Sequence, residues 1–122
     1  MEHLRTGVDL IEISRVEAVM QRYGQRFLNR VFTPQEQADS GGRAASLAAR
    51  FAAKEAAAKA LGCGIGLVGW LDIEITRDPE RRPGLVLHGE ARQRAQELRL
   101  REWSVSLSHS RDYAIALVVA AG

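Results

Sequence analysis

The sequence predicts an α+β fold, in which a small antiparallel sheet with a C-terminal hairpin packs on a long central helix. The stretch 43–61 is rich in alanine and free of glycine and proline, which favours one long helix ended by Gly62. Near the C-terminus, apolar side chains alternate with serines over 103–110, and a turn leads into an apolar run over 113–120. Strands and helices do not follow a βαβ rhythm, so we do not expect a parallel sheet.

The other elements follow from periodicity and from helix start signals. Ser14 with Glu17, and Thr33 with Glu36, have the spacing of capping boxes, in which two side chains bond the free backbone groups at a helix start. The expected elements are a strand over 4–10, helices over 14–30 and from Thr33 onward, the long helix over 43–61, strands over 71–75 and 85–87, a helix over 90–100, and the hairpin over 103–120.

Length and composition indicate one globular domain over residues 1–122. The chain is 46% apolar and 26% charged, with a formal net charge of only +2. It has no run of apolar residues long enough to span a membrane and no secretory signal, so we expect a cytoplasmic protein. Cys63, the single cysteine, cannot form an internal disulfide, and we expect it to fill space in the core.

The basic residues are unevenly divided, because 15 are arginine and only two, Lys54 and Lys59, are lysine. Codon usage in a GC-rich genome explains the ratio, but both lysines lie in the predicted long helix. At about 100° per residue, Arg43, Ser46, Arg50 and Lys54 form one polar stripe, which we expect to face solvent. On this basis, Lys54→Arg should leave the function unchanged.

Glu55 and Lys59 lie on another face of the same helix, among alanines. They form either an ordinary helical ion pair, contributing about 0.2–0.5 kcal/mol, or a polar site facing a cleft. Asp9 lies near the end of the first strand and points away from its apolar neighbours. If Asp9 and Glu55 meet in space they require a cation between them, and Mg²⁺ is often held by one or two carboxylates plus substrate phosphates. Their separation in the sequence leaves open whether they meet.

At these residues the chain resembles holo-acyl-carrier-protein synthase, the small bacterial 4′-phosphopantetheinyl transferase family. The resemblance covers essentially the whole chain, and the helix with its Lys-Glu-Ala-x-x-Lys-Ala pattern makes it specific. Arg5 is one departure, since the family usually has glycine there. The matching segments are Gly7-Val8-Asp9, the stretch 50–62 with its Gly64-Ile65-Gly66 tail, Asp72-Ile73-Glu74-Ile75, Ser106-Leu107-Ser108-His109-Ser110, and Tyr113-Ala114.

The resemblance implies the phosphopantetheinyl transferase fold and transfer of 4′-phosphopantetheine from coenzyme A to a serine of an apo acyl carrier protein. Asp9 and Glu55 would ligate Mg²⁺, and Lys59 would contact the coenzyme phosphates, so that Lys59→Arg should impair transfer. The resemblance also implies a homotrimer with sites at subunit interfaces, and a role in fatty-acid or polyketide synthesis. The implied coenzyme-binding residues are Arg50, Lys59, Gly64, Ser108 and His109.

Four arginines, at spacings of 7, 4 and 4, would share one side of the helix predicted over 14–30 if Gly24 does not break it. They form either a solvated face or, given the resemblance, a docking surface for an acidic carrier protein. Two other classes are weaker: a nucleic-acid-binding module conflicts with the small net charge, and a non-catalytic relative conflicts with the filled motif positions. We therefore expect neither a nucleic-acid nor a membrane partner. The four arginines are Arg15, Arg22, Arg26 and Arg30.

Overall fold

The structure, a computed structural model that describes residues 3–122, confirms the α+β class. A three-stranded antiparallel sheet has the order β1-β5-β4, and β2 and β3 form a separate antiparallel pair. The elements in chain order are β1 (Leu4–Glu12), α1 (Ile13–Tyr23), α2 (Gln25–Val31), α3 (Pro34–Ser40), α4 (Ala44–Ala60), the 3-10 turn η1 (Trp70–Asp72), β2 (Ile73–Arg77), β3 (Pro83–Leu87), α5 (Gly89–Glu97), β4 (Glu102–His109) and β5 (Tyr113–Ala121).

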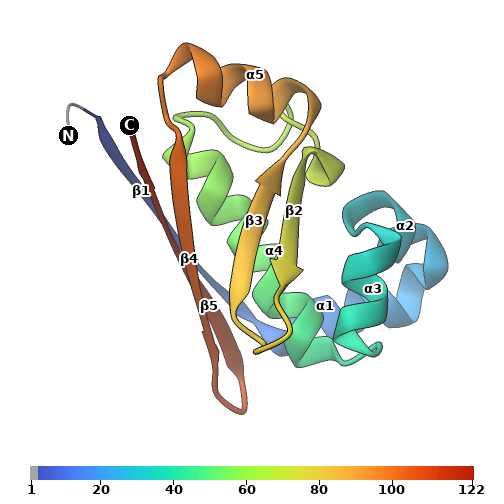
Figure 1. Cartoon of the computed structure of the whole chain (residues 1–122). Coiled ribbons are helices and arrows are strands. Elements are labelled where there is room, and N and C mark those ends of the chain that lie inside the picture. Colours follow the sequence, from blue (N-terminus) through green and yellow to red (C-terminus); the bar gives the residue numbers. More distant parts are fainter. Residues whose placement is uncertain (1–2) are drawn as a thin grey trace.

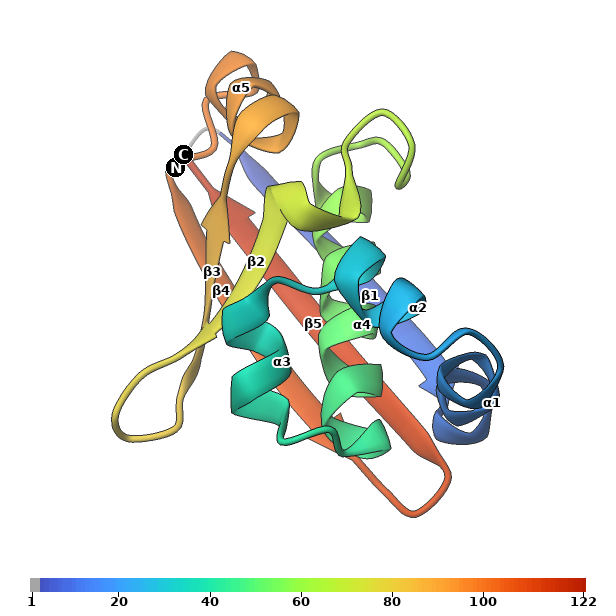
Figure 2. The ribbon, with the colours of Figure 1, turned by 90° about the vertical axis from the view of Figure 1, so that its right-hand side faces the viewer.

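The predicted long helix, α4, is central to the fold. It packs across β1 and β5 and also contacts β2, α1 and α3 (Figures 1 and 2). Small side chains fill its contact with the sheet, which allows the helix and strand backbones to approach closely. The fully buried alanines there include Ala52, Ala53, Ala56, Ala57, Ala60, Ala114, Ala116 and Ala120.

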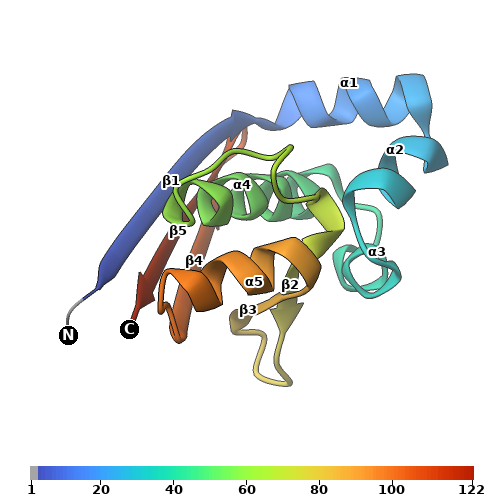
Figure 3. The same cartoon turned by 90° about the horizontal axis from the view of Figure 1, so that it is seen from above.

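The C-terminal hairpin forms as predicted, and its second strand is the central one of the sheet. β5 pairs with β4 on one side and with β1 on the other. Seen from above, the three strands lie together at one side of α4, and α5 and β2 lie on its other side (Figure 3). The N-terminal strand therefore joins the C-terminal hairpin in one sheet, which places Asp9 next to α4.

The helix predicted over 14–30 is wrong in its extent. Gly24 has a φ of 57°, in the left-handed region that favours glycine, and it divides the segment into α1 and α2. The first of these helices begins at Ile13, and its N-cap is Glu12 without a side-chain cap bond, so the predicted Ser14 capping box does not form. The four arginines consequently do not share one helix face.

The capping box at Thr33 is confirmed. Its hydroxyl accepts a hydrogen bond from the backbone N–H of Glu36, whose carboxylate accepts one from the Thr33 N–H. Several other boundaries shift by a few residues. The first strand continues to Glu12, and the strand expected over 85–87 begins at Pro83. The strand expected over 71–75 begins at Ile73, after η1, and the helix expected to reach residue 100 ends at Glu97.

The solvent-exposed stripe predicted on the long helix is also wrong. Lys54 is fully buried and Arg50 is 5% exposed, because α3 and β2 cover this side of α4. Only Arg43, which precedes the first turn, is exposed as predicted. Helical periodicity identified a polar face, but α3 contributes an acidic partner that turns this face into a buried one.

The outer face of the sheet carries exposed apolar side chains. Leu4 and Leu10 are each 60% exposed, and they lie in β1 on the face opposite α4. In β5, Ile115 and Leu117 lie on the same face, paired with Leu10 and Val8 across the strands. Within residues 3–122, none of the helices combines the length and the apolar character that crossing a bilayer requires.

Candidate active site

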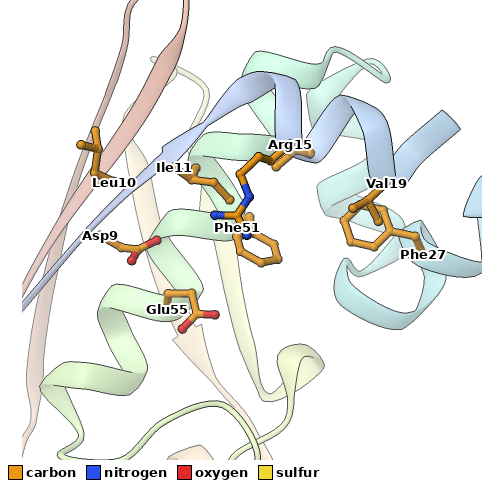
Figure 4. A pocket seen from close by; sticks show the side chains of 9 residues that line it. Asp9, Leu10, Ile11, Arg15, Val19, Phe27, Phe51 and Glu55 are labelled. Carbon is orange, nitrogen blue, oxygen red and sulfur yellow. The ribbon is translucent and has the colours of Figure 1, made fainter. Parts of the chain in front are cut away.

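Asp9, Glu55 and Lys59 come together between β1 and α4. The ammonium of Lys59 donates hydrogen bonds to the carbonyl oxygen of Val8, at 2.8 Å, and to Asp9 Oδ1, at 3.2 Å. Asp9 and Glu55 line the same cavity, and their carboxylates lie near one another in Figure 4. Lys59 therefore pairs with Asp9 of the strand, and the ordinary helical pair with Glu55 is not the interaction found.

The electrostatics of this cluster are those of a site for a cation. Burial raises the pKa of Glu55, the negative charge of Asp9 raises it further, and Lys59 opposes both effects. A carboxylate whose proton affinity is raised by a second carboxylate beside it would also attract a metal ion. Among residues 3–122, the structure holds no cluster of three or more His, Cys, Asp or Glu side chains suited to a metal.

A close backbone contact sets the separation between β1 and α4 at this site. A Cβ atom added at Gly7 would overlap the carbonyl oxygen of Ala56, one residue after Glu55. Asp9 follows two residues later on the same face of the strand, so it too points at α4. The first glycine of the Gly7-Val8-Asp9 segment thus permits the approach that brings the two carboxylates together.

The cavity beside these carboxylates has a volume of about 390 Å³ and is otherwise mostly apolar. Arg15 reaches into it from α1, and Phe51 of α4 forms part of its wall (Figure 4). The ring of Phe51 packs against Trp70, with the ring centroids 4.7 Å apart. The charged cluster therefore opens onto an apolar groove between α1 and α4.

A second, basic pocket of about 340 Å³ brings together three of the predicted coenzyme-binding residues, Arg50, Ser108 and His109. Ser108 and His109 are the last residues of β4, where the strand passes the first half of α4. Three further arginines line the pocket: one precedes α4, and two come from β2 and the β2–β3 turn. They are Arg43, Arg77 and Arg81.

The guanidinium of Arg50 is held at this pocket by its own helix. Its Nη1 donates to the carbonyl oxygen of Ser46, at 3.3 Å, and to the hydroxyl of that residue. Its Nε is buried and finds no hydrogen-bond partner among residues 3–122. Burial lowers the pKa of Arg50, and the negative charge of Asp39 partly offsets this effect. An arginine stays charged in a protein, so a pocket lined by Arg50 and three further arginines favours an anionic ligand.

The two pockets lie on different sides of α4 and share no lining residue. Arg50 and Glu55 are five positions apart, which places them about 140° apart around the helix. Gly64, the remaining predicted coenzyme contact, lies in the loop after α4, and a Cβ added there would meet nothing within 4 Å. The predicted coenzyme-binding residues are therefore separated within one chain: Arg50, Ser108 and His109 line the basic pocket, whereas Lys59 lies beside Asp9.

The predicted docking arginines are exposed but divided between two helices. Arg15 and Arg22 belong to α1, and Arg22 lies over the ring of Tyr23, with 5.4 Å from its Cζ to the ring centroid. Arg26 and Arg30 belong to α2 and line a separate hollow with Tyr23. The basic character of this surface is as expected, although its geometry is not that of a single stripe.

The positions of several residues in these sites could not be predicted from sequence patterns. Arg77 and Arg81 reach the basic pocket through the β2–β3 pairing, which joins segments too short to be aligned from sequence alone. Phe51 lies within a matching motif, but only its packing against Trp70 reveals it as a cavity wall. The capping box at Thr33 predicted a role for Glu36 at a helix start. It did not predict the ion pair of Glu36 with Lys54.

Comparison with known proteins identifies the class. The family model of the 4′-phosphopantetheinyl transferase superfamily matches residues 5–118. The chain therefore belongs to this superfamily, and the resemblance inferred from its motifs is confirmed.

Its relatives narrow the class further. The chain is 55% identical to the holo-[acyl-carrier-protein] synthase of Herpetosiphon aurantiacus, over 98% of this chain and 99% of that protein. It is 54% identical to that of Moorella thermoacetica, over 95% and 92%. Among solved structures, the Helicobacter pylori holo-[acyl-carrier-protein] synthase in complex with coenzyme A superposes with a TM-score of 0.88 and 34% identity, over 95% of this chain and 99% of that chain.

Proposed function

We propose that this protein transfers the 4′-phosphopantetheine group of coenzyme A to a serine hydroxyl of an apo acyl carrier protein. The single observation that carries the proposal is the convergence of Asp9, Glu55 and Lys59 in a member of this superfamily. The serine hydroxyl gives its proton to a base, and its oxygen forms a bond to the phosphorus next to the pantetheine arm. The bond from that phosphorus to the rest of the diphosphate breaks, and adenosine 3′,5′-bisphosphate leaves.

The carboxylates of Asp9 and Glu55 fit a magnesium ion. They line one cavity, and the charge on Asp9 contributes to the raised pKa of Glu55. Two carboxylates without further acidic ligands suit Mg²⁺, which commonly completes its shell with water and substrate phosphates. When bound, the ion would neutralise charge on the phosphates and lower the pKa of a bound water.

Lys59 is suited to hold a phosphate beside those carboxylates. Its side chain is 52% exposed, so its ammonium can reach a ligand while it remains close to Asp9. Phosphoryl transfer depends mostly on positioning and on charge neutralisation, and a compact ammonium supplies both. The role of Lys59 in this proposal is to orient the diphosphate for in-line attack.

The basic pocket would bind another phosphate of the coenzyme. Arg50 lines this pocket with a charged guanidinium, and Ser108 and His109 add a hydroxyl and a ring nitrogen. Gly64 would allow the backbone of its loop to approach the coenzyme, because no side chain occupies that space. These assignments extend the coenzyme site to both sides of α4.

A homotrimer would unite the two pockets. A coenzyme bound at Glu55 cannot reach Arg50 of the same chain by a short path, because α4 lies between them. The exposed apolar face of the sheet, with Leu4, Leu10 and Leu117, suits contact with another copy of this chain. We propose that each site combines the carboxylates of one subunit with the basic pocket of its neighbour.

The carrier protein would dock on the basic surface formed by Arg15, Arg22 and Arg26. Acidic partners are attracted by such a surface, which raises the association rate and orients the serine. Arg15 is the nearest of the three to the carboxylates, since it lines their cavity. The carrier protein would belong to fatty-acid or polyketide synthesis, and the enzyme would act in the cytoplasm, where such substrates occur. A single domain over residues 1–122 would carry out the transfer.

The direct test is a change in the mass of the carrier. The protein is incubated with coenzyme A, Mg²⁺ and apo acyl carrier protein, and the carrier is followed by mass spectrometry. A gain of one phosphopantetheinyl group supports the proposal, whereas no gain with several fatty-acid and polyketide carriers contradicts it. Omission of Mg²⁺ in the presence of a chelator should stop the gain.

A further inference from the structure

Lys54 is fully buried, although it lies next to Glu55 in the sequence. Its ammonium donates to Glu36 Oε1, at 2.7 Å, and to the carbonyl oxygen of Trp70, at 2.9 Å. Burial lowers the pKa of Lys54, and the neighbouring Glu36 carboxylate opposes that change. A buried ion pair is often no more stabilising than apolar residues of similar volume, so its presence calls for an explanation beyond stability.

Glu36 is the counter-ion that makes this buried ammonium possible. Besides Lys54, its carboxylate accepts hydrogen bonds from the backbone N–H of Thr33, at 2.8 Å, and of Ile75, at 2.9 Å. These bonds attach α3 and β2 to the ion pair. Glu36 is therefore held by backbone N–H groups at the start of α3 and in β2. Of the two charged side chains, Lys54 is the one that bonds η1, the turn that precedes β2.

The contact of Lys54 with Trp70 fixes the end of the loop that follows α4. This loop covers residues 62–69, includes Gly64, and leads directly into η1. The Trp70 ring, in turn, packs on Phe51, which lines the cavity of Asp9 and Glu55. One ammonium thus links the loop to the wall of that cavity through a single residue.

We propose that Lys54 is a positioning residue of the transferase. By holding the Trp70 carbonyl, it sets the loop over 62–69 and the ring of Phe51 in place before the substrates bind. Glu36 supplies the neutralising charge. The proposed catalytic consequence rests on the transferase function, whereas the anchoring of the loop does not depend on it.

The test separates positioning from stability. Lys54→Met leaves Glu36 buried and unpaired, so this variant should lose both stability and activity. In the double variant Lys54→Met with Glu36→Gln, the unpaired charge is gone, and the one remaining acceptor oxygen can keep only one of the bonds from Thr33 and Ile75. The double variant should regain part of the lost stability in urea unfolding, but kcat/KM should stay about tenfold or more below wild type, as for other supporting residues.

Amide hydrogen exchange provides a readout without substrates. Residues 62–72 should exchange faster in the double variant than in the wild type, while β4 and β5 should keep their protection. The control is Arg92→Met, an exposed position on α5, which should change neither activity nor exchange. Recovery of full activity with stability, or unchanged exchange over 62–72, would overturn the proposal. A wild type that transfers nothing contradicts the proposed function, and the exchange data still decide the anchoring.

Discussion

Lys59 Nζ lies 3.2 Å from Asp9 Oδ1, although 50 residues separate the two along the chain. The contact joins the first strand to the central helix at the side where Glu55 also faces the cavity. One cation and two anions therefore share a small volume before any ligand is present. A metal ion would be attracted to the two carboxylates, and a diphosphate would be attracted to the metal ion and to the ammonium of Lys59.

Asp9→Asn and Glu55→Gln should each abolish transfer while leaving the fold intact. Both substitutions keep the shape of the side chain but remove the charge that would hold Mg²⁺. Carrier mass measures transfer, and thermal unfolding measures stability. Glu17→Gln, at an exposed position on α1, is the matched control and should remain active. Retained activity in either Asp9→Asn or Glu55→Gln would refute the metal assignment.

Lys59→Arg should lower kcat/KM for coenzyme A by about tenfold, or about 1.4 kcal/mol. The planar guanidinium is larger than an ammonium and cannot make the same contacts with the Val8 carbonyl and Asp9. Steady-state kinetics with saturating carrier would measure the change. An unaltered kcat/KM would show that any positive charge suffices at this position.

Variants in the two pockets should complement each other if the active site is shared between subunits. Glu55→Gln and His109→Ala should each have little or no activity alone. Co-expressed, they should recover up to about a quarter of the wild-type activity, because randomly mixed cyclic trimers contain interfaces with both wild-type halves. The matched control is Asp9→Asn with Glu55→Gln, which alter the same pocket and should show no recovery. Absence of recovery by Glu55→Gln with His109→Ala would argue against the shared site.

Arg15→Glu, Arg22→Glu and Arg26→Glu should raise KM for the carrier protein far more than KM for coenzyme A. The reversed charges would repel an acidic carrier, chiefly through a slower association rate that depends on salt. Arg22 and Arg26 give the clearer result, because Arg15 also lines the carboxylate cavity. Arg92→Glu, on the exposed side of α5, is the control for net charge. Equal effects on both KM values would contradict the docking role.

The Glu74 carboxylate should make stability depend on pH. A hydrogen bond with His88 lowers the pKa of Glu74 most strongly, and one from Thr33 lowers it further, while burial opposes both. A lowered pKa in the folded state stabilises the protein above the ordinary value of 4.5, and this stabilisation is lost as pH falls through the folded pKa.

Urea unfolding from neutral pH to about pH 3 measures this contribution. Glu74→Gln should be less stable than the wild type at neutral pH, and the two curves should converge under acid conditions, where Glu74 is protonated. Glu17→Gln, which removes an exposed charge on α1, should show no such convergence. A difference between Glu74→Gln and wild type that stays constant with pH would exclude the titration of Glu74 as its cause.

Local signals in the sequence predicted much of the fold. The capping box at Thr33 depends on neighbouring residues alone, and it forms as expected. The hairpin over 103–120 also follows from alternation within one segment. Gly24 shows the limit of such reasoning: glycine within a helical pattern is compatible with a continuous helix, and only its backbone conformation reveals the break.

The candidate site was predictable in its residue types, because the motif around Glu55 and Lys59 pointed to the family. Its contacts were less so. The burial of Lys54 depends on Glu36, which is 18 positions away on another helix. Helical periodicity describes one helix at a time, so it cannot distinguish a polar face that meets water from one that meets an acidic neighbour.

The overlap that any side chain at Gly7 would produce with the Ala56 carbonyl has a consequence for how the site tolerates change. Even Gly7→Ala, which adds one methyl group, would push the strand outward. The added Cβ would lie 1.8 Å from that oxygen, whereas real contacts stay above 3.0 Å, so Asp9 would move with the strand, away from Glu55. The movement would exceed the tolerance of about 0.2 Å of a metal's coordination shell. A residue with no functional group thus acts as the spacer that sets how far apart the two carboxylates stand.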